Sequence, residues 1–201
     1  MAKDYSTIFN HLEKVSTVCS ILSFWFGTQQ KTIAWPISIA ITLMNLPYYF
    51  YKELYVTVFH HFIHILISLY GWYAWAHEPE GGKKLQRISR TSSQEWLFIT
   101  LSVALYMVFF YPVLEYVGAR LPLVDMVRNV LTLVGLWATS RKKLETYLIW
   151  LVVNVISVYV HQRTKSYWFM CKYIFYLGLS IYSFYTWYRA YRKEALAITN
   201  S

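Results

Sequence analysis

The sequence reads ISLYGWYAW at residues 67–75 and LSIYSFYTW at residues 179–187. A serine, two tyrosines and the final tryptophan occupy the same places in both phrases, and the spacing between the phrases is 187 − 75 = 112 residues. The same spacing places Tyr55 on Tyr167, so the tyrosine and the final tryptophan are 20 residues apart in each copy (75 − 55 and 187 − 167). Self-similarity at a fixed spacing predicts an internal structural repeat.

Apolar segments follow one another along the chain with short polar breaks. Of the 201 residues, 57% are hydrophobic, 20% aromatic and 14% charged, whereas soluble domains carry roughly 25% charged residues. The apolar segments are 12–27, 33–50, 55–76, 95–118, 123–140, 146–160 and 167–188. Several are slightly shorter than the roughly 20 residues that cross a bilayer. Their unbroken succession still predicts an all-α integral membrane protein with seven transmembrane helices, rather than the buried helices of a soluble core.

The repeat divides these helices into groups of three, one and three. Within a single membrane domain (1–201), residues 12–76 form the first three-helix repeat, 95–118 a connector helix and 123–190 the second repeat. Three helices reverse the direction of the chain and the connector restores it, so we expect two parallel copies. Parallel repeats are a transporter plan in which the substrate binds near the membrane midplane. Trp35 and Trp150 are 115 residues apart, which predicts a gap in one loop.

The net charge of +9 is interpreted as membrane topology rather than as a nucleic-acid surface. When the helix ends are assigned alternately to two sides, 11 of the 19 Lys and Arg residues lie opposite the N-terminus and 8 lie on its side. The dense clusters KKLQRISR (83–90), SRKK (140–143) and RAYRK (189–193) all belong to the richer side. Cytoplasmic loops carry the Lys and Arg excess. We therefore expect the C-terminus inside and the N-terminus outside.

One face of the third helix in each copy carries polar and aromatic side chains. The faces consist of His61, His64, Ser68, Trp72 and Trp75 in the first copy and Tyr173, Tyr176, Ser180, Phe184 and Trp187 in the second. Polar groups at membrane depth face a bundle interior or a watery cavity, so we expect the two faces to meet across a central space. The neighbouring helices add Thr42, Asn45, Asn129, Thr132, Asn154 and Ser157 near the middle of their spans.

Simpler interpretations exist for these side chains. Asn, Ser and Thr often only join membrane helices by hydrogen bonds. Trp72, Trp75, Trp187 and Tyr185 fit an interfacial aromatic belt as well as they fit a binding site. His60 and His64 share a helical face, but no acidic or cysteine ligand accompanies them, so no metal site is expected.

The chemistry of the segments favours passive transport of a flat solute. A proton relay through His61 and His64 is an alternative. However, the acidic residues Glu53, Glu115, Asp125 and Glu145 stand at helix ends, and ion-coupled carriers usually place ionisable or coordinating groups at depth. The sequence contains no GxSxG elbow, phosphate loop or paired membrane carboxylates, so neither an enzyme nor a cofactor is expected. An aromatic cavity with a few amides suits a cationic or heteroaromatic solute, held by cation–π contacts and oriented by hydrogen bonds.

Particular motifs resemble the PnuC family of bacterial nicotinamide riboside transporters. The motifs are AWPISI (34–39), YKELY (51–55), SLYGWYAW (68–75), the run from Asp125 through Trp137 to Arg141-Lys142-Lys143, and YLIWLVVNVISVYV (147–160). The resemblance extends from about residue 25 to residue 193. It implies a three-plus-one-plus-three fold related to the SWEET sugar transporters and a homotrimer in the bacterial inner membrane. It also implies facilitated uptake of a vitamin that is then trapped by phosphorylation.

The chain departs from the family pattern at His61, Leu136, Ile41 and Asn154, where the resemblance predicts glutamine, glutamine, asparagine and aspartate. Amide side chains can both donate hydrogen bonds to a carboxamide and accept hydrogen bonds from it. The departures therefore favour thiamine, which a branch of the family carries. The alternative is nicotinamide riboside, or another vitamin or nucleoside that the resemblance to this family allows. A non-transporting membrane scaffold or sensor is an alternative of another class. The expected substrate-binding residues are Asn45, His61, His64, Asn129, Trp137, Asn154, Tyr173, Tyr176 and Ser180.

Overall fold

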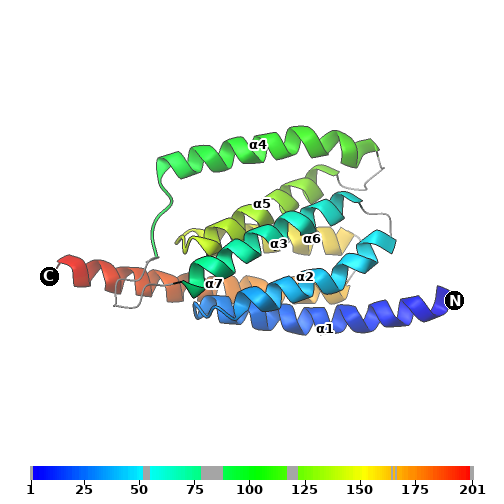
Figure 1. The fold of residues 1–201 in the computed structure, drawn as a ribbon, viewed down its shortest axis with the longest axis horizontal. Coiled ribbons are helices and arrows are strands. Elements are labelled where there is room, and N and C mark those ends of the chain that lie inside the picture. Colours follow the sequence, from blue (N-terminus) through cyan, green and yellow to red (C-terminus); the bar gives the residue numbers. More distant parts are fainter. Residues whose placement is uncertain are drawn as a thin grey trace. The chain divides into compact units, whose positions relative to one another are not determined.

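The computed structural model describes residues 2–51, 55–77, 88–116, 122–163, 165 and 167–199. Apart from one isolated bridge, the regular structure in this part of the chain is helical (Figure 1). The helices are α1 (Ala2–Thr28), α2 (Ala34–Tyr51), α3 (Tyr55–Ala76), α4 (Ser93–Tyr116), α5 (Pro122–Ser140), α6 (Thr146–Arg163) and α7 (Tyr167–Thr199). They coincide with the seven apolar segments, so the all-α prediction is confirmed. α1 and α7 extend beyond the predicted spans.

The helices belong to two compact units, Met1–Ala76 and His77–Ser201, which we describe separately. In the first unit α1 packs on α2 and α2 packs on α3. In the second unit α4 packs on α5, α5 on α6 and α6 on α7. Within each unit successive helices run antiparallel (Figure 1). The exact extents of the two repeats stay a prediction.

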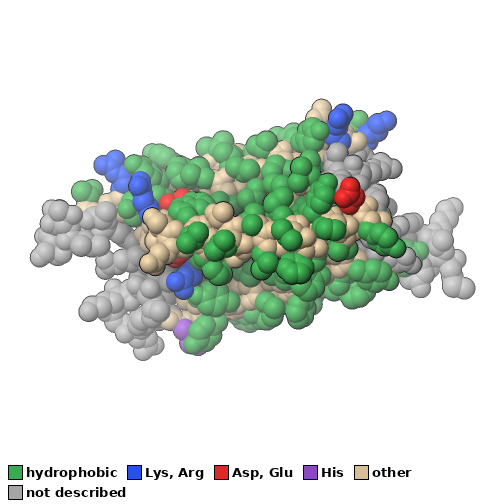
Figure 2. All heavy atoms as spheres, turned by 90° about the horizontal axis from the view of Figure 1, so that it is seen from above, with side chains coloured by type: hydrophobic (Ala, Val, Ile, Leu, Met, Phe, Trp, Pro, Cys, Tyr) green, Lys and Arg blue, Asp and Glu red, His purple; other side chains and the backbone are tan. Residues whose placement is uncertain are grey.

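Helix α4 has the strongest membrane character. In the described part of the chain it is the one helix that is long and apolar enough to cross a bilayer by these two criteria alone. It exposes a row of large apolar side chains: Leu97, Phe98, Leu101, Leu105, Val108 and Phe109. Figure 2 shows a face covered mostly by apolar side chains, with Lys and Arg gathered toward its ends. Such a surface suits a hydrocarbon environment better than water.

The turn after α1 and the turn after α5 have the same backbone. Gln30 has a φ of 56° and Lys142 has a φ of 48°, and their spacing is 142 − 30 = 112 residues. The amide of Gln30 donates to the carbonyl of Gly27 at 3.0 Å, and the amide of Lys142 donates to that of Thr139 at the same distance. A left-handed residue closing a helix is a common way to satisfy its last carbonyls. The two loops therefore match without an insertion.

An edge-to-face aromatic contact follows each of these turns. The rings of Trp35 and Trp75 are 5.3 Å apart at 88°, and those of Tyr147 and Trp187 are 5.1 Å apart at 87°. Both residues of the second pair lie 112 positions after those of the first (147 − 35 and 187 − 75). The counterpart of Trp35 is thus Tyr147, and the loop gap predicted from Trp150 is wrong.

The same contacts decide the role of the tryptophans near the ends of α3 and α7. Trp75 is 4% exposed and Trp187 is fully buried, so both are core residues of their units rather than part of an interfacial belt. Trp72 and Tyr185 are exposed, as belt residues would be. The belt interpretation is therefore wrong for Trp75 and Trp187 and remains open for the other two.

Glycine is required where the larger ring of the first pair packs. A Cβ on Gly71 would lie 2.5 Å from the ring of Trp35, closer than real side chains approach. At the corresponding position (71 + 112 = 183) the second unit has Ser183, which is fully buried. There the opposite residue is Tyr147, whose ring is smaller. The two units thus combine a large ring with glycine and a smaller ring with serine.

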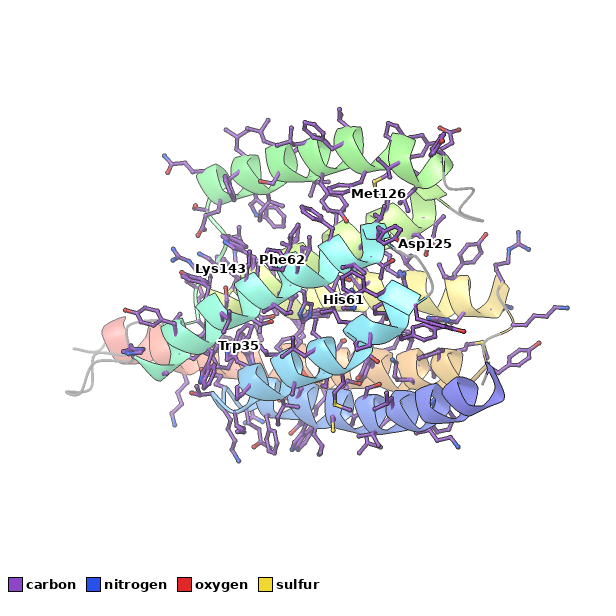
Figure 3. The ribbon with its side chains drawn as sticks, turned by 45° about the vertical axis from the view of Figure 1, so that its right-hand side comes forward. Trp35, His61, Phe62, Asp125, Met126 and Lys143 are labelled. Atoms are coloured by element: carbon purple, nitrogen blue, oxygen red, sulfur yellow. The ribbon has the colours of Figure 1, made fainter. Side chains whose placement is uncertain are left out.

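The segment that precedes α4 is tied to the turn that follows α5. The amide of Ser89 donates to the carbonyl of Lys142 at 3.2 Å, and the amide of Leu144 donates to the carbonyl of Ser89 at 2.9 Å. The side chain of Lys143 donates to a carboxylate oxygen of Glu95 at 2.8 Å. Lys143 is only 7% exposed, so this ion pair is largely shielded from solvent. The beginning of α4 is therefore anchored to the second unit at this turn, which Figure 3 marks by Lys143.

Replacing Gly71 by alanine should destabilise the first unit. The added methyl group collides with the ring of Trp35, and overpacking of this kind costs about 1–3 kcal/mol. Thermal unfolding of the purified protein in detergent measures the effect. Gly178→Ala is the matched control, because nothing lies within 4 Å of its Cβ, and alanine favours a helix over glycine by about 1 kcal/mol.

The second unit suggests how to rescue this loss. Combining Gly71→Ser with Trp35→Tyr reproduces the pair Tyr147 and Ser183 in the first unit. The double variant should unfold at a higher temperature than Gly71→Ser alone. Equal stability of Gly71→Ala and Gly178→Ala would contradict the packing described here.

Candidate functional site

A hydrogen-bonded polar cluster joins α2 and α3 in the first unit. Thr42 Oγ1 lies 3.2 Å from Nδ1 of His64 and donates its hydrogen to the carbonyl of Ser38 at 2.8 Å. Ser68 Oγ lies 3.5 Å from the same nitrogen. Thr42 and Ser68 are buried, 4% and 0% exposed. This cluster of two hydroxyl groups and an imidazole is called the first polar cluster.

A corresponding cluster joins α6 and α7 in the second unit. The amide nitrogen of Asn154 donates to Ser180 Oγ at 3.0 Å, and both side chains are buried. These residues lie 112 positions after Thr42 and Ser68 (154 − 42 and 180 − 68). The counterpart of His64 is Tyr176 (64 + 112), which is 7% exposed. This second polar cluster therefore has the place of the first but not its chemistry.

A column of rings extends from the first polar cluster along α3. The ring centroid of His61 is 6.4 Å from that of His64, with 22° between the planes. The ring of Tyr49, near the end of α2, lies 4.6 Å from that of His61. The Nδ1 of His61 is 2.8 Å from the carbonyl oxygen of Thr57. Figure 3 shows Trp35 and His61 toward opposite ends of the α2–α3 pair.

The second unit has the same column with two ring types exchanged. His161 and Tyr173 are stacked at 5.2 Å and 10°, and Tyr173 meets Tyr176 at 6.0 Å. His161 corresponds to Tyr49 (49 + 112), and Tyr173 corresponds to His61 (61 + 112). A tyrosine–histidine contact therefore occurs at the same place in both units, but the histidine is on α3 in one and on α6 in the other.

The contacts between these helices recur every seven residues. In the first unit they are Trp35 with Trp75, Thr42 with Ser68 through His64, and Tyr49 with His61. In the second unit they are Tyr147 with Trp187, Asn154 with Ser180, and His161 with Tyr173. A seven-residue repeat is typical of antiparallel helices that pack along one shared seam. We call these contacts the aromatic, polar and Tyr–His rungs.

An ammonium group already lies over the rings of the second unit. The Nζ of Lys172 is 4.8 Å from the ring centroid of Phe169 and 4.9 Å from that of Tyr173. His161 stacks on both of these rings, at 5.1 and 5.2 Å. Aromatic faces attract a cation within about 6 Å of the centroid. The ring column can therefore hold positive charge without a carboxylate.

Six of the nine predicted binding residues lie in the polar clusters or the ring columns. His61 and His64 lie together in the first unit, and Asn154, Ser180, Tyr173 and Tyr176 lie in the second. The other three make different contacts among the described residues. Asn45 donates to the carbonyl of Ile41 in its own helix, Asn129 accepts from Arg128 at 3.5 Å, and Trp137 is half-buried on α5.

Sequence reasoning missed Tyr49 and His161. Both stand where the 112-residue shift would have found them, opposite the polar faces of α3 and α7. The sequence interpretation includes Thr42 among the polar residues near the middle of the helices but not among the expected binding residues. Among the residues that the structure describes, no three His, Cys, Asp or Glu side chains form a group that could hold a metal ion.

Comparisons with known proteins agree with this architecture. Residues 10–189 match the family model described as nicotinamide mononucleotide transporter. The nicotinamide riboside transporters PnuC of Escherichia coli (strain K12) and Shigella flexneri are each 23% identical over 209 residues, covering 91% of this chain and 87% of theirs. A structure described as the crystal structure of the vitamin B3 transporter PnuC shares the fold, with a TM-score of 0.70 and 18% identity, over 96% of this chain and 88% of that chain. The chain is therefore an all-α integral membrane protein that belongs to the nicotinamide mononucleotide transporter family.

Proposed function

We propose that this protein carries a vitamin with a flat cationic ring across the bacterial inner membrane by facilitated diffusion. Thiamine is the leading substrate and nicotinamide riboside is the alternative. Membership of a transporter family supports the class of function, and the relatives' names support a vitamin as the solute.

The observation that carries the proposal is the pairing of aromatic rings with neutral hydrogen-bonding groups in each unit. In the first unit the ring column meets the polar cluster at His64, and in the second unit the ring column includes Tyr176, the counterpart of His64. The ammonium of Lys172 over Tyr173 shows that these rings accept positive charge. Cation–π contacts contribute about 0.5–2 kcal/mol each, more where water is excluded. A flat cation thus finds attraction and orienting hydrogen bonds without a buried carboxylate.

The helices that carry the clusters favour uncoupled transport. Of the four helices that carry the clusters, α2, α3 and α6 contain no aspartate or glutamate, and α7 has one, Glu194, well beyond its cluster residues. Carriers that use ion gradients place ionisable or coordinating groups at membrane depth. Net uptake would then depend on consumption of the vitamin inside the cell, and phosphorylation is a reaction that traps it.

The choice between the two vitamins depends on the amide content of the clusters. The second polar cluster contains one amide, Asn154, and the first contains none. A carboxamide is best read by several amides, whereas thiamine combines a permanent cation with two flat rings. We also expect a homotrimer with the C-terminus in the cytoplasm, as in the sequence interpretation.

Substituting predicted binding residues should weaken vitamin binding without unfolding the protein. Asn154→Ala removes the amide of the second polar cluster, and Trp137→Ala removes an aromatic ring of the predicted site. Each should raise the dissociation constant by roughly 5- to 150-fold, as expected for the loss of about 1–3 kcal/mol. Isothermal titration calorimetry with thiamine and with nicotinamide riboside provides the measurement.

Ser183→Ala is the matched control for these variants. Its hydroxyl is equally buried, and it donates to the carbonyl of Leu179 in its own helix. Its affinity should equal that of the parent protein. Unchanged affinity in both Asn154→Ala and Trp137→Ala would show that the site lies elsewhere. Tight binding of nicotinamide riboside with no thiamine signal would reverse the order of the two substrates.

Transport in liposomes should be independent of ion gradients. Counterflow of labelled thiamine should proceed at the same rate with and without a sodium or proton gradient, because no acidic residue on α2, α3 or α6 can couple an ion. Clear stimulation by either gradient would refute facilitated diffusion. Absence of exchange with either vitamin, despite binding, would favour the membrane scaffold or sensor.

A further inference from the structure

The hydrogen bonds of Thr42 decide which nitrogen of His64 carries a hydrogen. A threonine hydroxyl has one hydrogen to donate. The carbonyl oxygen of Ser38, 2.8 Å away, can only accept, so the hydrogen of Thr42 is directed to Ser38. Toward His64, at 3.2 Å, the Thr42 oxygen can then only accept. Nδ1 of His64 is therefore the donor of this bond and carries a hydrogen, so Ser68 Oγ, 3.5 Å from the same nitrogen, faces it as an acceptor too.

The surroundings of His64 favour the neutral ring. No aspartate or glutamate occurs in α2 or α3 to balance an imidazolium, and a charged side chain within a membrane helix is costly. A neutral imidazole with its hydrogen on Nδ1 has a lone pair on Nε2. No side chain in the described part of the chain donates to that Nε2. The ring is thus fixed by Thr42 at one nitrogen and has an acceptor at the other.

The tautomer of His61 follows from its own hydrogen bond in the same way. Its Nδ1 is 2.8 Å from the carbonyl oxygen of Thr57, which can only accept. His61 therefore also carries its hydrogen on Nδ1. The rings of His61 and His64 are nearly parallel, at 22°.

The geometry points to His64 as the residue that recognises a hydrogen-bond donor of the substrate through Nε2. The substrate class is thereby narrowed to flat cations that carry an NH2 group, such as an aminopyrimidine or a carboxamide. Analogues with an oxo or carboxylate group at that place are disfavoured, because two acceptors would face each other. This inference rests on the proposed function and adds that the protein accepts, and the substrate donates, the hydrogen bond at His64. The corresponding Tyr176 hydroxyl can donate or accept and imposes no such restriction.

Matched ligand pairs test the inference. Thiamine and oxythiamine differ by an amino group against an oxo group, and nicotinamide riboside and nicotinic acid riboside differ by a carboxamide against a carboxylate. The parent protein should bind the NH2 member of its pair roughly 5- to 150-fold more tightly. His64→Gln, which places an amide oxygen near the position of Nε2, should retain much of this preference. His64→Leu, of similar bulk but without an acceptor, should reduce the ratio to about 1.

The outcomes separate the inference from the proposed function. An NH2 preference that persists in His64→Leu would overturn the role of His64 while leaving vitamin transport intact. Failure of the parent protein to bind either NH2 ligand would overturn the proposed function and this inference together. A parent protein that binds both members of a pair equally would overturn the inference alone.

The tautomer can be measured without a ligand and without the leucine variant. Nitrogen NMR of protein labelled with ¹⁵N-histidine distinguishes a nitrogen that carries a hydrogen from one that does not. The chain has 6 histidines, so the signals that vanish in His64→Gln identify His64. We expect a hydrogen on Nδ1 and a bare Nε2. The opposite tautomer, or hydrogens on both nitrogens near neutral pH, would overturn the inference.

Discussion

The edge-to-face contact at the aromatic rung sets the register on which the rest of each unit depends. Trp35 meets Trp75 in one unit and Tyr147 meets Trp187 in the other, with nearly identical distances and angles. Seven residues are two turns of helix, about 10.5 Å, so fixing this contact brings the polar rung and then the Tyr–His rung into place. Gly71 belongs to the same constraint, because the ring of Trp35 occupies the space of its missing side chain. The polar clusters are therefore a consequence of register as much as of their own hydrogen bonds.

The helices and the 112-residue repeat could be predicted because α3 and α7 have several identical amino acids at equivalent positions. The contacts of α2 and α6 could not, because their equivalent residues differ in type. Trp35 is matched by Tyr147, and the tyrosine and histidine of the Tyr–His rung exchange helices. Matching by residue type instead paired Trp35 with Trp150. The indole of Trp150 donates to Thr139 and packs beside Gly135. Geometry is conserved between the units where amino-acid identity is not.

Hydrogen-bond satisfaction explains why single site residues were harder to predict. Asn45 and Asn154 look alike in sequence, but the first donates to its own helix and the second donates to a neighbouring helix. Lys143 contributes to a basic cluster that suggested a cytoplasmic loop, yet its ammonium is paired with Glu95. It therefore stabilises the anchor of α4 as well as adding to the charge of that side. Counting polar or charged residues in the sequence does not separate side chains that bond within the protein from side chains that face a solute.

At the polar rung the two units have the same helix register but different side chains. One has a threonine, a serine and a histidine, and the other has an asparagine, a serine and a tyrosine at the corresponding positions. In the first unit the cluster offers His64 as an acceptor for an NH2 group. In the second unit the tyrosine rings attract positive charge. Changes at His64 and Asn154 would therefore alter the hydrogen-bonding groups of each cluster without altering the register, because the aromatic rung of each unit holds that register.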